Sequence, residues 1–152
     1  MVEPYLEHVP LYEDDRGSVY CALDNIGDGG RRPQYSIKRT YVVHNWKAGL
    51  IRAWHGHEHG WTGLHVIQGV AKLIAKPIRP HESILGKAVI LSDRRPGIFW
   101  VPPGYYNGSM SLVDNTKILV YSTLSFDEVK QDDVRKQLTD DEIGNLWKVK
   151  NR

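Results

Sequence analysis

Three histidines at alternate positions are the residues of this 152-residue chain whose type and spacing best allow chemistry. They are His55, His57 and His59, and they end an apolar run. Successive side chains of a β-strand point to opposite sides, so we expect one face to carry these histidines together with Ile51 and Ala53. Such a face is typical of a small-molecule pocket with an apolar floor and a polar mouth.

Clustered imidazoles can hold a metal ion or transfer protons. Neighbouring like charges and partial burial both lower the pKa of a histidine, which keeps one member neutral and able to accept a proton near pH 7. His55 stands closest to the apolar end of the face. We therefore predict that His55 is a general base.

A second patterned segment precedes the histidines, at residues 35–43. Alternation places Ile37, Arg39, Tyr41 and Val43 on one face. In a functional interpretation, Arg39 meets an anion and Tyr41 donates or relays a proton. In the alternative interpretation, Tyr41 is a packing residue and Arg39 lies on the rim.

The rest of the chain consists of short β-branched and aromatic runs separated by Gly, Pro and Asp, which predicts an all-β fold. We expect strands at residues 18–23, 35–44, 50–58, 65–67, 71–77, 88–91, 98–101 and 117–124. Turns are expected at residues 27–30, 45–49 and 102–104. This number of strands fits an antiparallel jelly-roll barrel.

Only the C-terminal part changes character. Capping boxes beginning at Ser125 and Thr139 predict one or two short helices there. We expect Leu138, Ile143, Leu146 and Trp147 to form the buried side of this segment.

Length and composition limit the class of protein. The chain is long enough for one domain, here residues 1–152, and its net charge of +2 gives no large positive field for nucleic acid. Its single cysteine excludes an intrachain disulfide. The first residues lack the pattern of a secretion signal and no run is long enough to span a membrane, so we expect a cytoplasmic protein.

Over residues 14–135, the chain resembles the cupin nucleotide-sugar epimerases and ketoisomerases. Residues 14–17 (DDRG) resemble the D-x-R-G of that family, and residues 37–41 (IKRTY) resemble the I-K-R-x-Y of its ketoisomerases. Residues 52–57 (RAWHGH) are similar to R-G-x-H-A-H, and residues 97–103 (GIFWVPP) to G-L-Y-I-P-P. The common order and similar spacing of these segments make the resemblance specific.

The resemblance implies a cupin jelly roll that isomerises a 4-keto-6-deoxy sugar on a nucleotide diphosphate, with dTDP as the inherited nucleotide. It implies a homodimer and no cofactor. The second histidine, His57, and a short following loop favour the 3,4-ketoisomerases. Residues 104–108 (GYYNG) look more like the epimerases, so a 3-, 5- or 3,5-epimerase is the alternative.

The metal-binding cupins use a longer ligand pattern than this chain supplies. His55 and His57 fit it, but the glutamate position falls on Trp61 or Thr62 and the last histidine position holds Asn107. We therefore expect no metal. A metal-dependent cupin and a non-catalytic sugar-binding module remain as further alternatives.

The resemblance also implies roles for individual residues. His55 would move the carbon-bound proton, Tyr41 would serve the oxygens, and His57 would orient the sugar or stabilise the enediolate. The predicted substrate-binding residues comprise candidate diphosphate ligands, a residue at the pocket and an aromatic that could stack on the base: Arg16, Arg39, Arg52, Asn107 and Tyr106.

Overall fold

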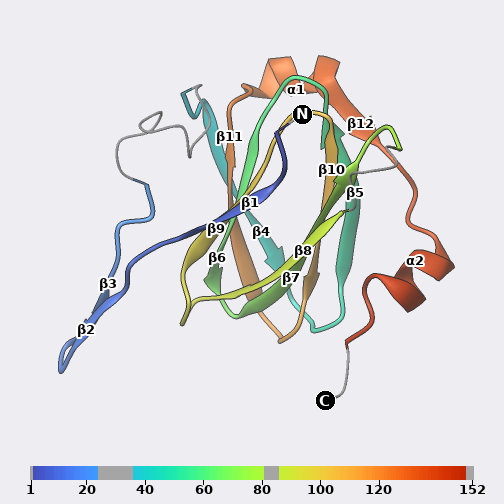
Figure 1. Ribbon diagram of the computed structural model, residues 1–152. Coiled ribbons are helices and arrows are strands. Elements are labelled where there is room, and N and C mark those ends of the chain that lie inside the picture. Colours follow the sequence, from blue (N-terminus) through green and yellow to red (C-terminus); the bar gives the residue numbers. More distant parts are fainter. Residues whose placement is uncertain (1, 24–35, 81–85, 150–152) are drawn as a thin grey trace.

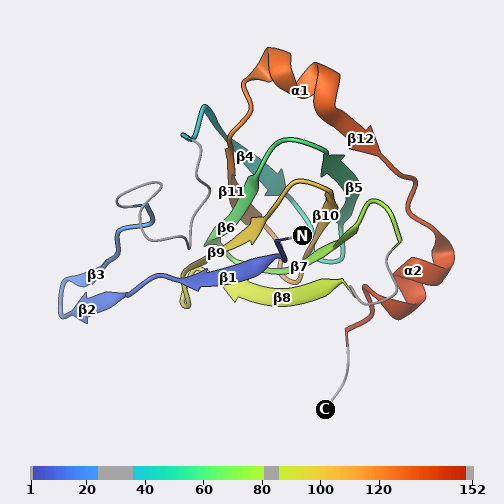
Figure 2. The same cartoon turned by 45° about the horizontal axis from the view of Figure 1, so that its top comes forward.

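Two five-stranded antiparallel sheets face each other in the computed structural model, which describes residues 2–23, 36–80 and 86–149 (Figures 1 and 2). The first sheet has the order β1 (Tyr5–His8), β9 (Gly97–Val101), β6 (Thr62–Gln68), β11 (Thr116–Ser122), β4 (Arg39–Asn45). The second has the order β12 (Asp133–Arg135), β5 (Ile51–His57), β10 (Tyr105–Ser111), β7 (Val70–Pro77), β8 (Lys87–Ser92). The predicted all-β jelly roll is confirmed. The turn expected at residues 27–30 lies outside the described residues.

A separate two-stranded hairpin extends away from the two sheets (Figure 2). It consists of β2 (Tyr12–Asp14) and β3 (Gly17–Val19), which are paired in register from Tyr12 opposite Val19. Every residue of both strands is exposed. The predicted strand at residues 18–23 is therefore mostly not a strand, and its start belongs to this hairpin.

The main core lies between the two sheets. Its buried side chains come from both of them, and they include Leu64, Val66, Leu73, Leu91, Phe99, Val101, Ile118 and Val120. A second cluster covers the outer side of the second sheet, where Trp54 packs against Trp147 with ring centroids 5.4 Å apart. Burial of these apolar surfaces on both sides of a sheet stabilises the barrel and fixes its shape.

The strand β10 was not among the strands expected from the sequence, although it lies between β5 and β7. The sequence did not indicate this strand because its middle residues, Asn107, Gly108 and Ser109, have a low intrinsic preference for strands. Its position between two partners supplies the hydrogen bonds that its composition does not predict. Gly108 is needed there, because a Cβ would lie 2.7 Å from the Cβ of Ala53.

Both predicted helices are confirmed. The helix α1 (Phe126–Asp132) begins after Ser125 and α2 (Asp140–Asn145) begins after Thr139, each with a complete capping box. The helix α1 lies at one end of the barrel (Figure 1), and α2 lies beside the second sheet (Figure 2).

The predicted buried side of the C-terminal segment is only partly correct. Trp147 is buried and Leu138 packs against the same cluster. Ile143 and Leu146, in contrast, are 41% and 40% exposed. The two-turn helix α2 contains no buried residue, but its Glu142 accepts a hydrogen bond from Trp54 and pairs with Lys76, which attaches the helix to the second sheet.

The expected alternation along β5 is wrong in its first half. Opposite β10, Asn107 pairs with His55 but Ser109 pairs with Arg52, so β5 carries one extra residue in this interval. Such a bulge exchanges the faces of the residues that precede it. Ile51 and Ala53 consequently pack in the outer cluster, while Arg52 joins His55 on the inner side.

Candidate active site

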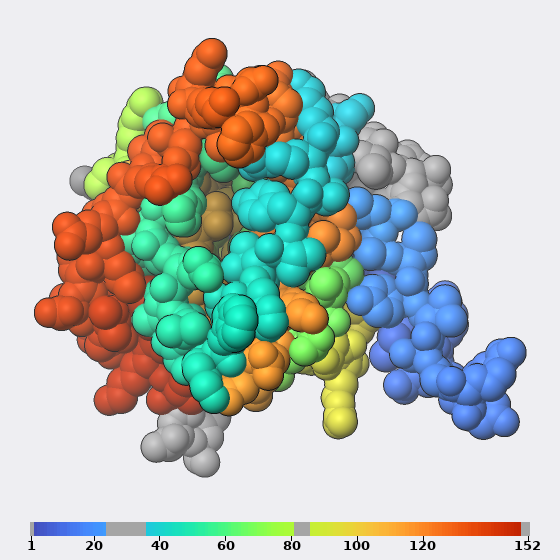
Figure 3. Space-filling model, turned by 180° about the vertical axis from the view of Figure 1, so that it is seen from behind, coloured from blue at the N-terminus to red at the C-terminus, as the bar shows by residue number. Residues whose placement is uncertain are grey.

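A cavity of about 530 Å³ lies between the two sheets, next to α1. Figure 3 shows its mouth as a hollow between β4, β5 and α1. The described residues that line it come from six strands and the helix: Arg39, Tyr41, Val43, Arg52, His55, His57, Thr62, Leu64, Asn107, Ser109, Ile118, Val120, Phe126, Val129, Asp133 and Arg135. A cavity of this size suits a small ligand.

Most of the predicted site residues meet in this cavity. Arg39 and Tyr41 enter from β4 of the first sheet, as the alternation predicts. Arg52, His55 and His57 enter from β5 of the second. Asn107 joins them from β10, where its Nδ2 donates a hydrogen bond to the carbonyl oxygen of His55 at 3.0 Å.

Tyr106 is not among the residues that line the cavity. It belongs to the outer cluster with Trp54 and is 8% exposed. Asn107 faces the cavity, and its neighbour on the same strand must face the other side. Alternation along β10 would have separated these two residues, had that strand been recognised.

Arg16 lies in the turn between β2 and β3, the hairpin that extends away from the two sheets (Figure 1), and it is not among the residues that line the cavity. Its side chain is 85% exposed and forms an ion pair with Asp14 two residues before it. The fold therefore separates Arg16 from the other predicted ligands.

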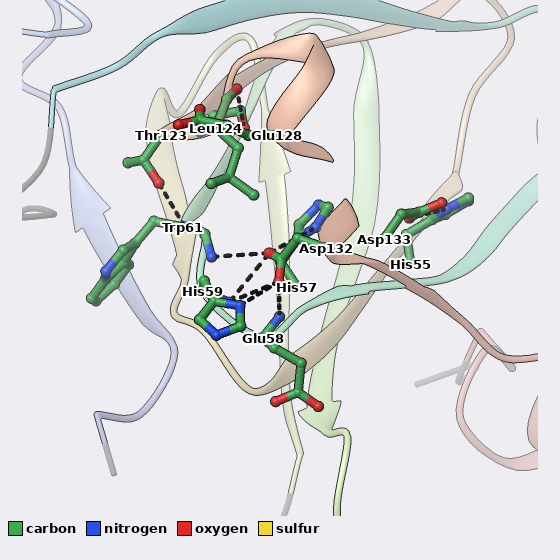
Figure 4. Close-up of polar contacts among 12 residues, drawn as sticks. His55, His57, Glu58, His59, Trp61, Thr123, Leu124, Glu128, Asp132 and Asp133 are labelled. Carbon is green, nitrogen blue, oxygen red and sulfur yellow. Dashed lines mark hydrogen bonds and ion pairs between the residues drawn. The ribbon is translucent and has the colours of Figure 1, made fainter. Parts of the chain in front are cut away.

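His59 does not share the face of His55 and His57, because β5 ends at His57 and the alternation of its side chains ends there. Its side chain is 83% exposed, and its Nδ1 lies 2.8 Å from Oδ1 of Asp132 at the end of α1 (Figure 4). Of the three alternating histidines, only His55 and His57 line the cavity.

His55 has the environment of a neutral base. Burial, the largest cause, and the nearby guanidinium of Arg135 lower its pKa, while the carboxylate of Asp133 opposes this shift. The Nδ1 of His55 lies 4.0 Å from Oδ1 of Asp133. Near pH 7 the imidazole is therefore mainly unprotonated and can accept a proton.

The pKa of Tyr41 is shifted in the opposite direction from that of His55. Burial raises the pKa of its phenol, Arg39 lowers it and Asp133 raises it, with a net rise. The guanidinium of Arg39 lies 4.8 Å from the centre of the Tyr41 ring. The phenol therefore stays protonated and can donate a proton or a hydrogen bond.

Two residues of the cavity, Asp133 and Arg135, were not predicted from the sequence. They stand two positions apart on β12, which pairs with β5 so that Asp133 lies opposite His57 and Arg135 opposite His55. The Nε of Arg135 lies 2.6 Å from Oδ2 of Asp133. Their alternation was visible, but a three-residue charged strand carries too little pattern to be assigned.

The cavity also holds two guanidinium groups that pair with no carboxylate in the described part of the chain. Among the described residues, Arg39 and Arg52 form no ion pair. Nε of Arg39 is buried without a hydrogen-bond partner, and Nε of Arg52 donates to Oδ1 of Asn45 at 2.8 Å. Guanidinium groups in this condition favour an anionic ligand, above all one with phosphate oxygens.

The apolar part of the cavity comes from the first sheet. Val43, Leu64, Ile118 and Val120 line it, in place of the Ile51 and Ala53 expected from β5. A wall of this kind excludes water and suits the carbon skeleton of a ligand, while the charged residues lie on other walls.

In the described part of the chain, no three His, Cys, Asp or Glu side chains are placed to hold a metal ion. The described residues also contain no helix long and apolar enough to cross a membrane.

Two facing antiparallel sheets with a ligand-sized cavity between them define a cupin-like jelly roll. No profile of a known protein family matches the chain, and no curated protein matches its sequence. Solved structures do match, and they include dTDP-sugar epimerases and 3,4-ketoisomerases. The predicted relationship in fold is thereby confirmed.

Three of these structures illustrate the match. The dTDP-4-dehydrorhamnose 3,5-epimerase of Bacillus anthracis, solved with TDP and PPi, has a TM-score of 0.80 at 22% identity, over 97% of this chain and 86% of that one. ChmJ, a 3'-monoepimerase of Streptomyces bikiniensis in complex with dTDP-quinovose, gives 0.79 at 14%, over 95% and 74%. The 3,4-ketoisomerase QdtA of Thermoanaerobacterium thermosaccharolyticum, in complex with TDP, gives 0.67 at 19%, over 88% of each chain.

Proposed function

We propose that this protein isomerises a 4-keto-6-deoxy sugar carried on a nucleotide diphosphate, as a 3,4-ketoisomerase. One observation carries the proposal. His55, with a lowered pKa, and Tyr41, with a raised pKa, line the same cavity from opposite sheets. A base and an acid that face one small volume are what a proton-transfer isomerase needs.

The chemistry follows from the ketone. A carbonyl at C4 acidifies the proton at C3, which His55 removes to give an enediolate. Return of this proton to C4, with transfer of the hydroxyl proton between the oxygens through Tyr41, moves the ketone to C3. The substrate loses and regains protons only, so its overall oxidation state does not change.

The arginines at the cavity are suited to bind the diphosphate of the substrate. Arg39 and Arg52 are free of ion pairs among the described residues, and two such side chains can hold the oxygens of a diphosphate while the sugar meets the histidines. Arg135 adds a third guanidinium at the cavity. The TDP and dTDP-sugar complexes of the similar structures support a thymidine nucleotide.

An epimerase is the second candidate. Tyr41 and His55 approach from opposite sheets, so a proton removed on one face of the sugar ring has a donor on the other face. The presence of His57 beside His55 favours the ketoisomerase, because it resembles the second histidine of that branch.

We also propose that the protein acts as a homodimer. The exposed hairpin carries Tyr12 and Val19, which are 71% and 74% exposed, and such apolar side chains favour contact with a second copy. Arg16 stands at the turn of this hairpin. If the hairpin contacts a second copy, Arg16 would bind the substrate in the cavity of that partner subunit. Light scattering on the purified protein tests the dimer.

One experiment distinguishes the candidates. The protein is incubated with dTDP-4-keto-6-deoxyglucose in deuterated water without added metal, and the sugar protons are followed by NMR. Deuterium at C4 with a new C3 ketone supports the ketoisomerase, and deuterium at C3 or C5 with inversion supports the epimerase. No exchange contradicts both, and nucleotide-sugar binding alone would indicate a binding module. Activity that appears only when a metal ion is added would indicate a metal-dependent cupin.

A further inference from the structure

Asp132 is a buried carboxylate that neither lines the cavity nor was expected from the sequence. It is the last residue of α1 and is 8% exposed. It accepts hydrogen bonds from the backbone N–H groups of Glu58, His59 and Gly60 at 3.1 to 3.2 Å (Figure 4). Asp132 thereby attaches the end of α1 to the loop that follows β5.

This carboxylate remains ionised in the folded protein. Burial alone raises its pKa, but the hydrogen bonds from the side chain of His59 and from the backbone of His59 and Gly60 outweigh burial and lower it. An ionised carboxylate can only accept hydrogen bonds. Any nitrogen that faces Asp132 at short range must therefore carry a proton.

His57 presents such a nitrogen. Its Nδ1 lies 3.6 Å from Oδ2 of Asp132, just beyond ordinary hydrogen-bond length, and is buried without any other partner among the described residues. The His57 side chain is 11% exposed and lines the cavity. Because Nδ1 is directed at the carboxylate, Nε2 is the nitrogen left for a ligand.

We propose that Asp132 is a positioning residue that keeps the proton of neutral His57 on Nδ1, so that His57 presents an unprotonated Nε2 to the ligand as a hydrogen-bond acceptor. The proposal deepens the function proposed above and rests on it for the ligand. The consecutive residues Asp132 and Asp133 then face His57 and His55 respectively, which gives the cavity two carboxylate–imidazole pairs.

The consequence concerns the hydroxyl groups of the sugar. A neutral His57 with its proton on Nδ1 offers a lone pair on Nε2, which accepts a hydrogen bond from a hydroxyl donor. Besides Asp132, the ionisable groups that line the cavity in the described part of the chain are Arg52 and His55 on the same strand, Asp133 and Arg135 on β12, and Arg39 and Tyr41 on β4. His57 would thus accept a hydrogen bond from the sugar hydroxyl whose proton Tyr41 relocates.

The test reads the tautomer directly and needs no substrate. Long-range ¹H–¹⁵N correlation spectra of the ¹⁵N-histidine-labelled protein are recorded at about pH 8.5, where imidazoles are mostly neutral. A His57→Gln spectrum assigns the signals. We expect a protonated Nδ1 and an unprotonated Nε2 for His57. A proton on Nε2, or a mixture of the two tautomers, would overturn the proposal.

Two variants provide a second test of the proposal. Asp132→Asn should shift His57 towards the Nε2–H tautomer and lower kcat about 10- to 100-fold, a loss typical of residues that orient a site histidine, with little change in KM. His59→Gln removes the other imidazole on the same carboxylate but leaves the backbone N–H donors of residues 58–60, so it should change both much less. Equal kcat for Asp132→Asn and His59→Gln would contradict the proposal.

The two proposals fail separately. If the wild-type spectrum shows the expected tautomer but no nucleotide sugar is turned over, the positioning by Asp132 is supported and the proposed function is wrong. The wild-type spectrum decides the tautomer even if Asp132→Asn does not fold.

Discussion

Nδ1 of His55 lies 4.0 Å from Oδ1 of Asp133, across two strands that pair only because the C-terminal segment returns to the barrel. A carboxylate behind an imidazole orients the ring and stabilises its protonated form after proton transfer. The same Asp133 carboxylate also contacts Arg135. His55 therefore faces a carboxylate whose charge is shared with a guanidinium.

Replacing His55 by Asn should reduce turnover about 10²- to 10⁴-fold, the usual contribution of a general base. Binding of TDP, measured by calorimetry, should change little, because the arginines rather than His55 are proposed to hold the diphosphate. His59→Gln serves as the control, since the His59 side chain is 83% exposed and outside the cavity. Full activity of His55→Asn would remove this residue from the mechanism.

Removing the charge of Asp133 should shift the pH dependence. Asp133 raises the pKa of His55, so Asp133→Asn should lower this pKa further. The acid limb of kcat/KM, where the base becomes protonated, should then move to lower pH. The plateau rate should also fall, because the imidazolium formed during the reaction loses its counter-charge. A profile unchanged in position and height would show that Asp133 does not act on His55.

The variant Tyr41→Phe separates catalysis from packing. Tyr41 is 42% exposed and its hydroxyl has no hydrogen bond among the described residues, so loss of the hydroxyl should leave the thermal midpoint nearly unchanged. Turnover should fall by about tenfold or more, because the oxygens lose their proton relay. If instead the midpoint falls and turnover is kept, Tyr41 is a packing residue.

Arg39→Gln should weaken binding of TDP about 10- to 100-fold, as expected for loss of a charged hydrogen bond. Arg79→Gln is the matched control, since Arg79 is exposed and pairs with Glu58. The wild-type affinity should also fall with added salt, and less steeply in the Arg39 variant. Equal affinities of the two variants for TDP would mean that Arg39 does not bind the diphosphate.

Glu142 should stabilise the C-terminal segment in a pH-dependent way. Its carboxylate accepts a hydrogen bond from Nε1 of Trp54 and pairs with Lys76. Burial opposes ionisation, but these contacts outweigh it and lower its pKa to about 2. A lowered folded pKa gives stability that is complete above the unfolded value near 4.5 and is lost as the pH falls towards about 2.

Glu142→Gln should therefore lower the free energy of unfolding by about 1–3 kcal/mol at pH 7, measured by urea denaturation. The difference from wild type should shrink between pH 4.5 and about 2. Asp127→Asn, at an 89% exposed side chain, should have little effect. A pH-independent difference would mean that the charge of Glu142 does not contribute.

Local patterns in the sequence determined much of the site. Alternation placed Arg39 and Tyr41 on one face of β4 and put His55 beside His57, and both capping boxes located their helices. These relationships span two or three residues, so backbone geometry alone fixes them. The jelly roll followed from the number and spacing of the short strands.

Only the tertiary structure decided the rest. The bulge in β5 depends on pairing with β10, and it moved Arg52 into the cavity and Ile51 out of it. Asp132 reaches His59 from 73 positions away because α1 ends against the loop after β5. Contacts between such distant segments arise from the packing of whole elements, to which no repeat of two or three residues in the sequence corresponds.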